Sequence, residues 1–373
     1  MNKKIGIVLG TRPEAIKLIP VYLELKRTFS SVELISTGQH YSMLEQIFKF
    51  FEVTPDISLN VMTTNQSLSG LTAKLTECLQ TCYEERKYDL VIVQGDTTTA
   101  MTASLVAYYN RIKVAHIEAG LRTYNKYSPF PEEINRQIIG RIADFHFAPT
   151  QKAMNVLAKE EIKNSFLVGN TVIDSLLFCS QKIENNLSKY KEKFSFIGNF
   201  EKLVLITGHR RENFGEGFDG ICDAIRTLSE TYPSFLFYYP VHLNTNVKDK
   251  VYAVLSDLDN VMLNEPLPYD DLIFLMSRSY IILTDSGGIQ EEAPSLNVPI
   301  LVMRDTTERP EGIENGCAIL VGTSSEKIVE EFNNLVDNKS HYQQMAEAVN
   351  PYGDGKSSVA IASILKKQID NYC

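Results

Sequence analysis

Three charged residues in the first half of the sequence each follow a short apolar run. They are Arg12, Asp96 and Glu118. An apolar run that ends in a polar residue is typical of a parallel strand, and open α/β sheets bind ligands at the carboxyl ends of their strands. A guanidinium and two carboxylates at one sheet edge could move a proton and offset negative charge on a ligand. Alternatively, Asp96 could simply cap the helix that follows it.

Charged residues on the predicted helices could complete such a site. Lys17 lies in GTRPEAIK, the segment that opens a helix after the first apolar run, and could contact a phosphate or simply face solvent. Glu132 and Arg136 lie at i,i+4 spacing where another helix begins. That spacing predicts an intrahelical ion pair, although a carboxylate just after the loop TYNKYSPFP could equally face a cleft. His146 stands inside a short apolar run, and we expect it to be packed rather than to bind a ligand.

The stretch TDSGGIQEE, residues 284–292, predicts an anion-binding turn made of a strand end, a glycine turn and a helix start. The first N–H groups of a helix lack partners and favour negative charge, so a diphosphate fits there, with Ser286 as an added hydroxyl donor. Glu291 or Glu292 could accept hydrogen bonds from the two hydroxyls of a ribose. The alternative is that Asp285 or Ser286 only caps the helix and the glycines only form a turn.

A dense polar run, GHRREN, follows an apolar run in the second half of the sequence. Within it, His209 could act as a general acid or contact a phosphate, and Arg210 or Arg211 could offset charge on a departing pyrophosphate. The alternative is a solvated charged loop. His242 follows another apolar run in a comparable position.

Apolar runs alternate with helical patterns along the whole chain, which predicts an α/β fold of two Rossmann-like domains with parallel sheets. The strands expected in the first half are residues 4–9, 32–37, 89–94, 114–117 and 145–148. Those expected in the second half are residues 203–207, 235–239, 261–263, 280–283, 300–303 and 318–321. We expect a hinge at residues 169–175, between the two series. The turn after the first strand lacks the G-x-G-x-x-G fingerprint, so NAD binding is not expected.

Length and composition agree with two domains, because 373 residues exceed one ordinary domain. The content of 44% hydrophobic and 22% charged residues is typical of a globular protein, and the net charge of −9 argues against a general nucleic-acid binder. We see neither a signal peptide nor an apolar run long enough to span a bilayer, and therefore expect a cytoplasmic protein. The six scattered cysteines are expected to be reduced packing residues rather than metal ligands.

Eight motifs together resemble one enzyme family. They are GTRPEAIK, GDTTT, HIEAGLRT, SPFPEE-NR, VGNTVID, GHRREN, TDSGGIQEEAPSL and RDTTERPE. They occur in the order seen in bacterial UDP-N-acetylglucosamine 2-epimerases of the non-hydrolysing type, and the similarity extends from Gly10 to about Pro351. Several motifs in one order are far more specific than any one of them.

The resemblance implies a GT-B-like fold with the active site in the cleft between two domains, residues 1–170 and 171–352, and a C-terminal helix from about residue 353 that packs back on the first domain. It implies epimerisation at C2 of UDP-N-acetylglucosamine, for surface polysaccharide synthesis, by elimination of UDP to a 2-acetamidoglucal and re-addition. UDP and UDP-N-acetylglucosamine are the expected ligands, a homodimer is the expected assembly, and no metal or other cofactor is expected.

The resemblance also assigns roles to residues. Asp96, Glu118 and Glu132 match the catalytic carboxylates and His209 the catalytic histidine, and which carboxylate takes the proton stays open. The residues implied to bind UDP and the sugar are Arg12, Lys17, Arg136, Arg210, His242, Ser286, Gly287, Gly288 and Glu292.

Some members of the family are activated by their own substrate, through a segment that resembles Gln39-His40 and an arginine before a Gln-[Ser/Thr]-Leu motif. Here Asn65 precedes that motif, and Ser42 stands where a longer polar residue is common, which argues against activation although Gln39 and His40 remain. Two other functions stay open at this point: a hydrolysing relative that releases N-acetylmannosamine and UDP, and a GT-B glycosyltransferase.

Overall fold

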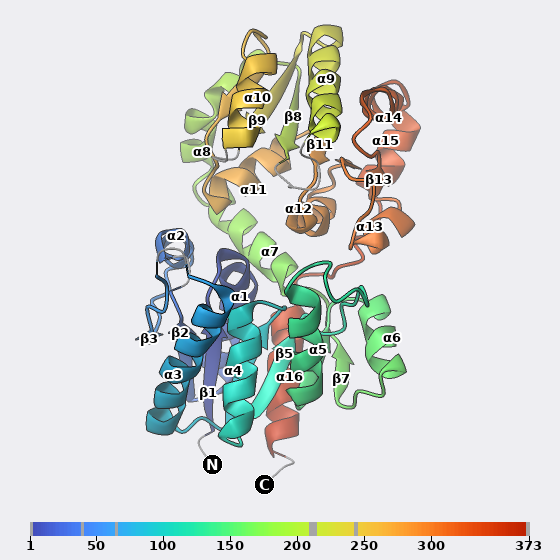
Figure 1. The fold of residues 1–373 in the computed structure, drawn as a ribbon. Helices are drawn as coiled ribbons and strands as arrows, with labels where there is room; N and C mark the ends of the chain where they lie inside the picture. Colours follow the sequence, from blue (N-terminus) through green and yellow to red (C-terminus); the bar gives the residue numbers. More distant parts are fainter. Residues whose placement is uncertain (1–2, 39–40, 64–65, 209–214, 242–244, 371–373) are drawn as a thin grey trace. The chain divides into compact units, whose positions relative to one another are not determined.

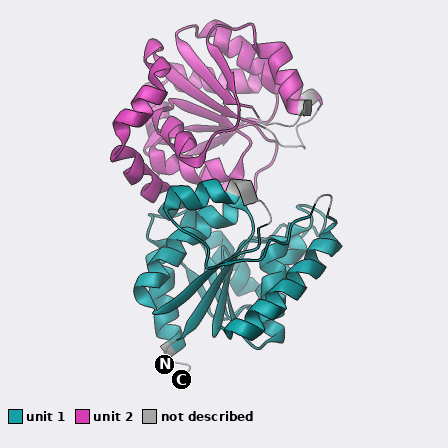
Figure 2. Ribbon diagram, turned by 90° about the vertical axis from the view of Figure 1, so that its left-hand side faces the viewer, with its two compact units in different colours: residues 1–175, 352–373 teal, residues 176–351 magenta. Residues whose placement is uncertain are grey.

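The computed structural model describes residues 3–38, 41–63, 66–208, 215–241 and 245–370. The chain divides into two compact units, shown in different colours in Figure 2. Unit 1 comprises residues 1–175 and 352–373, and unit 2 comprises residues 176–351. The division into domains of residues 1–170 and 171–352, which the resemblance implies, stays a prediction.

Unit 1 is built on a parallel sheet whose strands follow the order β3-β2-β1-β4-β5-β6-β7 within the described residues. The strands are β1 (Lys4–Leu9), β2 (Ser31–Ser36), β3 (Ile57–Ser58), β4 (Leu90–Gln94), β5 (Lys113–Ile117), β6 (Phe145–Ala148) and β7 (Ser165–Leu167). The central strands β1, β4 and β5 are almost wholly buried, because a parallel sheet is covered by helices on both faces. Figure 2 shows helices on the two sides of this sheet.

The helices of unit 1 connect successive strands. They are α1 (Arg12–Thr28), α2 (Tyr41–Phe51), α3 (Leu68–Arg86), α4 (Thr98–Tyr109), α5 (Glu132–Ile142), α6 (Gln151–Lys159), the first turn of α7 (Thr171–Glu184) and α16 (Ser357–Asp370). Helices α3, α4 and α5 pack side by side, and α1 packs against α16 (Figure 1). One core cluster lies between the sheet and helices α3, α4 and α5. It includes Leu75, Leu79, Val91 and Val106.

The start of α16 is held by a side chain that is distant in sequence. Asp174, in the first turn of α7, accepts hydrogen bonds from the backbone N–H of Ser358 at 2.8 Å and of Ser357 at 3.3 Å. Burial raises the pKa of the Asp174 carboxyl, against the lowering effect of these bonds. The carboxylate thus satisfies N–H groups that a helix start leaves without partners. Whether residues 169–175 act as a hinge stays a prediction.

Unit 2 is built on a second parallel sheet, with the order β10-β9-β8-β11-β12-β13 within the described residues. Its strands are β8 (Lys202–Thr207), β9 (Phe235–Pro240), β10 (Val261–Asn264), β11 (Ile281–Thr284), β12 (Ile300–Val302) and β13 (Ala318–Leu320). Its helices are the rest of α7, α8 (Leu187–Lys193), α9 (Glu216–Thr231), α10 (Thr245–Leu255), α11 (Tyr269–Arg278), α12 (Gly287–Glu292), α13 (Pro310–Glu314), α14 (Ser325–Asp337) and α15 (Lys339–Ala346), with 3-10 turns at Ser195–Asn199 and Ala293–Leu296.

The predicted α/β class with two parallel sheets is confirmed. Strands β3 and β7, at the two edges of the unit 1 sheet, were not predicted. Of the described helices, none is both long enough and apolar enough to cross a membrane. The five cysteines in the described part of the chain, Cys78, Cys82, Cys179, Cys222 and Cys317, are free thiols.

Candidate active site

The carboxyl ends of three neighbouring strands gather the charged residues of unit 1. Strands β1, β4 and β5 are adjacent in the sheet, and Arg12, Asp96 and Glu118 follow them within three residues. In a parallel sheet these ends lie at the same edge, so the topology brings the three side chains into one region. Arg12 is the first residue of α1 and is partly buried.

Glu118 has a strained backbone and a buried, paired carboxylate. Its φ of +63° lies in the left-handed region, where a residue with a Cβ is held only by surrounding structure, often at functional sites. Its Oε2 lies 2.7 Å from Lys17 Nζ and also accepts a hydrogen bond from Gln94 Nε2. Glu118 and Lys17 are only 7% and 8% exposed, so Lys17 is an interior partner of Glu118 and not a solvent-facing residue.

Asp96 is paired with Arg136, whose guanidinium NH2 lies 3.0 Å from Asp96 Oδ2. The alternative in which Asp96 caps α4 is wrong, because the N-cap of α4 is Thr97, whose hydroxyl accepts from the N–H of Ala100 at 3.0 Å. The carboxylate of Asp96 is therefore not used as a helix cap. Arg136 also lies 3.7 Å from a carboxylate oxygen of Glu133, so two acidic residues fix its position.

Glu132 is the first residue of α5, and the structure overturns the expected ion pair with Arg136. Among the residues that the structure describes, no hydrogen-bond partner contacts its buried Oε2 atom. Buried carboxylate oxygens are nearly always hydrogen-bonded, so an exception needs an explanation such as a catalytic role. Arg136 turns towards Asp96 because that carboxylate stands at the adjacent strand end.

Glu14 was missed by the sequence analysis. It is 1% exposed, and its carboxylate accepts hydrogen bonds from the N–H groups of Gly10 at 3.0 Å and Thr11 at 2.7 Å and from the hydroxyl of Thr97 at 2.7 Å. Burial raises its pKa despite these bonds. Glu14 thereby joins the start of α1 to the start of α4. The spacing Thr11-x-x-Glu14 is that of a capping box and could have signalled this role.

Glu133 was also missed, and it anchors the loop that precedes α5. It is fully buried and accepts from the N–H and hydroxyl of Thr123 at 2.9 and 3.1 Å, from the N–H of Tyr124 at 3.1 Å and from Gln137 Nε2 at 2.7 Å. Burial works to raise the pKa of Glu133, but these hydrogen bonds and the nearby guanidinium together lower it. The pair Glu132-Glu133 in the sequence carries no signal that distinguishes Glu133, which anchors the loop, from Glu132, whose Oε2 has no hydrogen-bond partner among the described residues.

Two buried histidines lie opposite each other on adjacent strands of unit 1. His116 on β5 pairs in register with His146 on β6, and their rings are 6.5 Å apart. The Nε2 atom of His116 lies 2.7 Å from the carbonyl oxygen of Gly95, and that of His146 lies 3.0 Å from the carbonyl oxygen of Ala143. Burial lowers the pKa of His116 to about 3 and that of His146 to about 4, so both rings are neutral and donate Nε2–H to these carbonyls. The predicted packing role of His146 agrees with this position.

In unit 2, Ser286 is the N-cap residue of α12, directly after β11 and Asp285. Its side chain makes no capping hydrogen bond, and its N–H donates to the hydroxyl of Thr284 at 3.0 Å. Gly287 is buried and Gly288 exposed in the first turn of the helix. The alternative in which the Ser286 hydroxyl only caps the helix is therefore not what the structure shows.

The two glutamates of α12 are buried and have different partners. Glu291 accepts from Arg309 Nε at 2.5 Å, and Glu292 accepts from the Tyr269 hydroxyl at 2.8 Å. Each of these bonds uses one carboxylate oxygen, so these contacts do not distinguish the two glutamates. The predicted ribose contact of Glu292 stays a prediction.

Several predicted site residues lie outside the described part of the chain. They are His209, Arg210, His242, Gln39 and His40. Their predicted roles stay predictions. Among the described residues, no group of three or more histidine, cysteine or acidic side chains could hold a metal ion.

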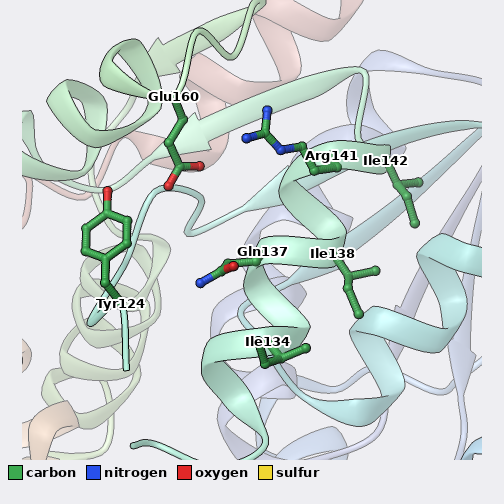
Figure 3. Close-up of a pocket in the computed structure, with 7 residues that line it drawn as sticks. All are labelled: Tyr124, Ile134, Gln137, Ile138, Arg141, Ile142 and Glu160. Atoms are coloured by element: carbon green, nitrogen blue, oxygen red, sulfur yellow. The ribbon is translucent and has the colours of Figure 1, made fainter. Parts of the chain in front are cut away.

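A pocket of about 510 Å³ lies elsewhere in unit 1. Figure 3 shows its wall of residues from α5, with Tyr124 and Glu160 opposite. The lining residues are Tyr124, Ile134, Gln137, Ile138, Arg141, Ile142 and Glu160. None of the predicted catalytic residues lines it, and we therefore place the candidate site at the strand ends and not in this pocket.

Comparison with known proteins gives matches along nearly the whole chain. The profile of the family described as UDP-N-acetylglucosamine 2-epimerase matches residues 23–366. The UDP-N-acetylglucosamine 2-epimerase of Campylobacter jejuni is 48% identical, over 100% of this chain and 99% of that protein. That of Escherichia coli strain K12 is 46% identical, over 97% of this chain and 98% of that protein.

Solved structures are also similar to this chain over nearly its whole length. The UDP-GlcNAc 2-epimerase from Neisseria meningitidis bound to UDP-GlcNAc has a TM-score of 0.92 at 46% identity, covering 98% of this chain and 100% of that chain. The enzyme from Methanocaldococcus jannaschii in complex with UDP-GlcNAc and UDP has a TM-score of 0.84 at 34% identity, covering 98% and 99%.

The buried pair of Lys17 and Glu118 predicts a strong effect when one partner is lost. Lys17→Met leaves a carboxylate buried without its cation, and we expect unit 1 to lose about 3–5 kcal/mol of unfolding free energy. Adding Glu118→Gln should recover part of this loss. Urea denaturation of the two single variants and the double variant measures the coupling, and Arg27→Met, in a solvent-exposed pair with Glu24, is the control. Additive effects of the two substitutions would contradict the pairing.

The low pKa of His146 predicts how stability depends on pH. The ordinary pKa of an unfolded histidine is 6.5, whereas the pKa of folded His146 is about 4. The stabilising effect of the neutral ring is therefore present above pH 6.5 and is lost as the pH falls towards 4. Between about pH 6 and about pH 4.5, the unfolding free energy of His146→Phe should fall less steeply than that of the wild type. The difference should be about 1.4 kcal/mol per pH unit. Parallel curves for variant and wild type would refute the shift.

Proposed function

The chain belongs to the UDP-N-acetylglucosamine 2-epimerase family, and from this premise we propose that it interconverts UDP-N-acetylglucosamine and UDP-N-acetylmannosamine without net hydrolysis. The observation that carries the proposal is the cluster of carboxylates in unit 1. Asp96 and Glu118 follow adjacent strands, each paired with a different cation, and Glu132 has a buried oxygen without a hydrogen-bond partner in the described structure. Three carboxylates in three different surroundings suit a reaction that both removes and returns a proton.

The proposed reaction breaks and remakes two bonds. A carboxylate removes the proton from C2, the bond between C1 and the UDP oxygen breaks, and a double bond forms between C1 and C2. The resulting 2-acetamidoglucal then receives a proton on the opposite face of C2, and UDP adds back to C1. The C2 proton is weakly acidic, so both a positioned base and charge stabilisation of the departing UDP are needed.

The cations of unit 1 support this chemistry in two ways. Lys17 and Arg136 hold Glu118 and Asp96 in fixed positions, so that these carboxylates need not reorganise during proton transfer. Arg12, at the end of β1, is proposed to contact the phosphates or the sugar. Of the residues outside the described ranges, His209 is proposed as a catalytic residue, and Arg210 and His242 as substrate-binding residues.

In unit 2 we assign UDP to the turn between β11 and α12. Its diphosphate would meet the N–H groups of Gly287 and Gly288 and the hydroxyl of Ser286, which is not used as a helix cap. Glu292, held by Tyr269 through one oxygen, would accept from the ribose hydroxyls. The homologous structures from Neisseria meningitidis and Methanocaldococcus jannaschii, which contain UDP-GlcNAc, support this choice of ligand.

The wider setting is part of the same proposal. We assign the product to surface polysaccharide synthesis and the protein to the cytoplasm, as a homodimer that works without a metal or nicotinamide cofactor. Gln39 and His40 are the residues to examine for activation by substrate.

Proton NMR of the purified protein with UDP-N-acetylglucosamine in D2O tests the function directly. Deuterium should enter C2 while UDP-N-acetylmannosamine grows to equilibrium and free UDP stays low. Stoichiometric UDP with free N-acetylmannosamine would replace the proposal with the hydrolysing reaction. No change with this substrate, but transfer when an acceptor is added, would indicate a glycosyltransferase.

Substitution of the carboxylates tests the assigned roles. Asp96→Asn, Glu118→Gln and Glu132→Gln should each lower kcat by about 10²–10⁴-fold, the usual contribution of general acid–base catalysis. Affinity for UDP, measured by calorimetry, should change little because we assign UDP to unit 2. Glu24→Gln, which removes a carboxylate that is paired with Arg27 on α1, is the matched control. Normal turnover in any of the three variants would remove that residue from the mechanism.

A further inference from the structure

The turn that carries Asp96 is held by two neutral side chains that the proposed reaction does not use. His116 Nε2 lies 2.7 Å from the carbonyl oxygen of Gly95, the residue before Asp96. Asn135 Nδ2 donates to the carbonyl oxygen of Asp96 itself at 2.8 Å. His116 comes from β5 and Asn135 from α5, so two elements on either side of the turn fix consecutive carbonyls.

This turn needs such support because of its backbone. Strand β4 ends at Gln94, and Gly95 has a φ of +70°, so the chain leaves the extended conformation just before Asp96, although the Gly95 N–H still donates to the carbonyl oxygen of Ile117 on β5 at 2.9 Å. The carbonyls of Gly95 and Asp96 therefore need partners from outside the strand. A rotation of either peptide would swing the Cα–Cβ bond of Asp96 and move its carboxylate relative to the substrate.

The two contacts differ from the ion pair that Asp96 makes. Arg136 holds the carboxylate group by its charge at 3.0 Å, whereas His116 and Asn135 contact the peptide carbonyls of Gly95 and Asp96 and not the carboxylate. Both side chains are nearly inaccessible, with exposures of 1% for His116 and 5% for Asn135. Their burial argues that they act on the turn and not directly on a substrate.

We propose that His116 and Asn135 are positioning residues for the epimerisation, which brace the Gly95-Asp96 turn so that the Asp96 carboxylate keeps its catalytic orientation. The inference rests on the proposed function, in which Asp96 takes part in the proton transfer at C2. Misplacing a reacting group by about 1 Å can cost about 10²-fold in rate, and the brace should matter on that scale.

The chain offers a matched control for His116. His146 is its neighbour on β6, is 2% exposed, and also donates Nε2–H to a backbone carbonyl. That carbonyl belongs to Ala143, at the end of α5 and away from Asp96. Losing a buried imidazole at residue 146 therefore removes the same chemical group without disturbing the turn.

The experiment compares His116→Phe, His116→Gln, Asn135→Leu and His146→Phe with the wild type. His116→Phe and Asn135→Leu should lower kcat by about 10²-fold with KM and the Kd of UDP unchanged. His116→Gln, whose amide can donate where Nε2–H did, should recover most of the loss. His146→Phe should keep wild-type kcat, although its unfolding free energy falls as much as that of His116→Phe.

A second measurement does not depend on activity. Hydrogen exchange of the peptide spanning residues 91–99 should speed up in His116→Phe and Asn135→Leu and stay at the wild-type rate in His146→Phe. The positioning role is overturned if His116→Phe and Asn135→Leu keep full kcat in an active enzyme, or if His146→Phe loses as much kcat as His116→Phe. An inactive wild-type enzyme would instead refute the proposed function. Unchanged hydrogen exchange in His116→Phe and Asn135→Leu would refute their stabilising effect on the Gly95-Asp96 turn, whatever the activity.

Discussion

The buried contact between Lys17 and Glu118 is the constraint on which unit 1 depends. A charge taken out of water must meet its partner, since an unpaired one costs several kcal/mol. Lys17 lies in the second turn of α1, and Glu118 directly follows β5, two strands away from β1 in the sheet. Bringing them to 2.7 Å fixes α1 over the ends of β1, β4 and β5, and Gln94 at the end of β4 supplies a further donor to the same oxygen. The left-handed backbone of Glu118 is maintained by these contacts, so the packing of the helix and the strain at the site have the same cause.

The fold was largely predictable from the sequence because buried parallel strands are continuous apolar runs. Strands β4, β5 and β6 needed no tertiary information, and their predicted ends agree with the structure to within one residue. Strands β3 and β7 were missed for a physical reason. Each is only two or three residues long and lies at an edge of the sheet, where few side chains are buried and the apolar signal disappears.

The site was only partly predictable, because a sequence shows which charges follow strands but not which way they turn. The charges at the ends of β1, β4 and β5 were identified, whereas their partners depend on tertiary contacts. Helical spacing predicted that Arg136 would meet Glu132, yet the strand end placed Asp96 within its reach. Equally, the sequence suggested Asp96 as a possible helix cap, whereas the N-cap in the structure is Thr97. Several buried side chains position the site through hydrogen bonds with backbone groups. They are Glu14, Glu133, His116 and Asn135. The sequence alone indicates only the role of Glu14, through its capping-box spacing.

The contact between α1 and α16 has a consequence for how the protein is made. Unit 1 is assembled from two segments of the chain, and the whole of unit 2 is encoded between them. During synthesis from the N-terminus, α1 leaves the ribosome early, but α16 and the serines that Asp174 contacts follow only after about 330 more residues (from Thr28 to Ser357) have been added. A nascent chain that ends within unit 2 therefore exposes the apolar surface of α1 that α16 later covers. All the strands of unit 1 precede unit 2 in the sequence, but unit 1 gains α16 only after unit 2 has been synthesised. Unit 2, a continuous segment, can therefore be complete before unit 1 is, which reverses the usual order in which the N-terminal part of a protein folds first.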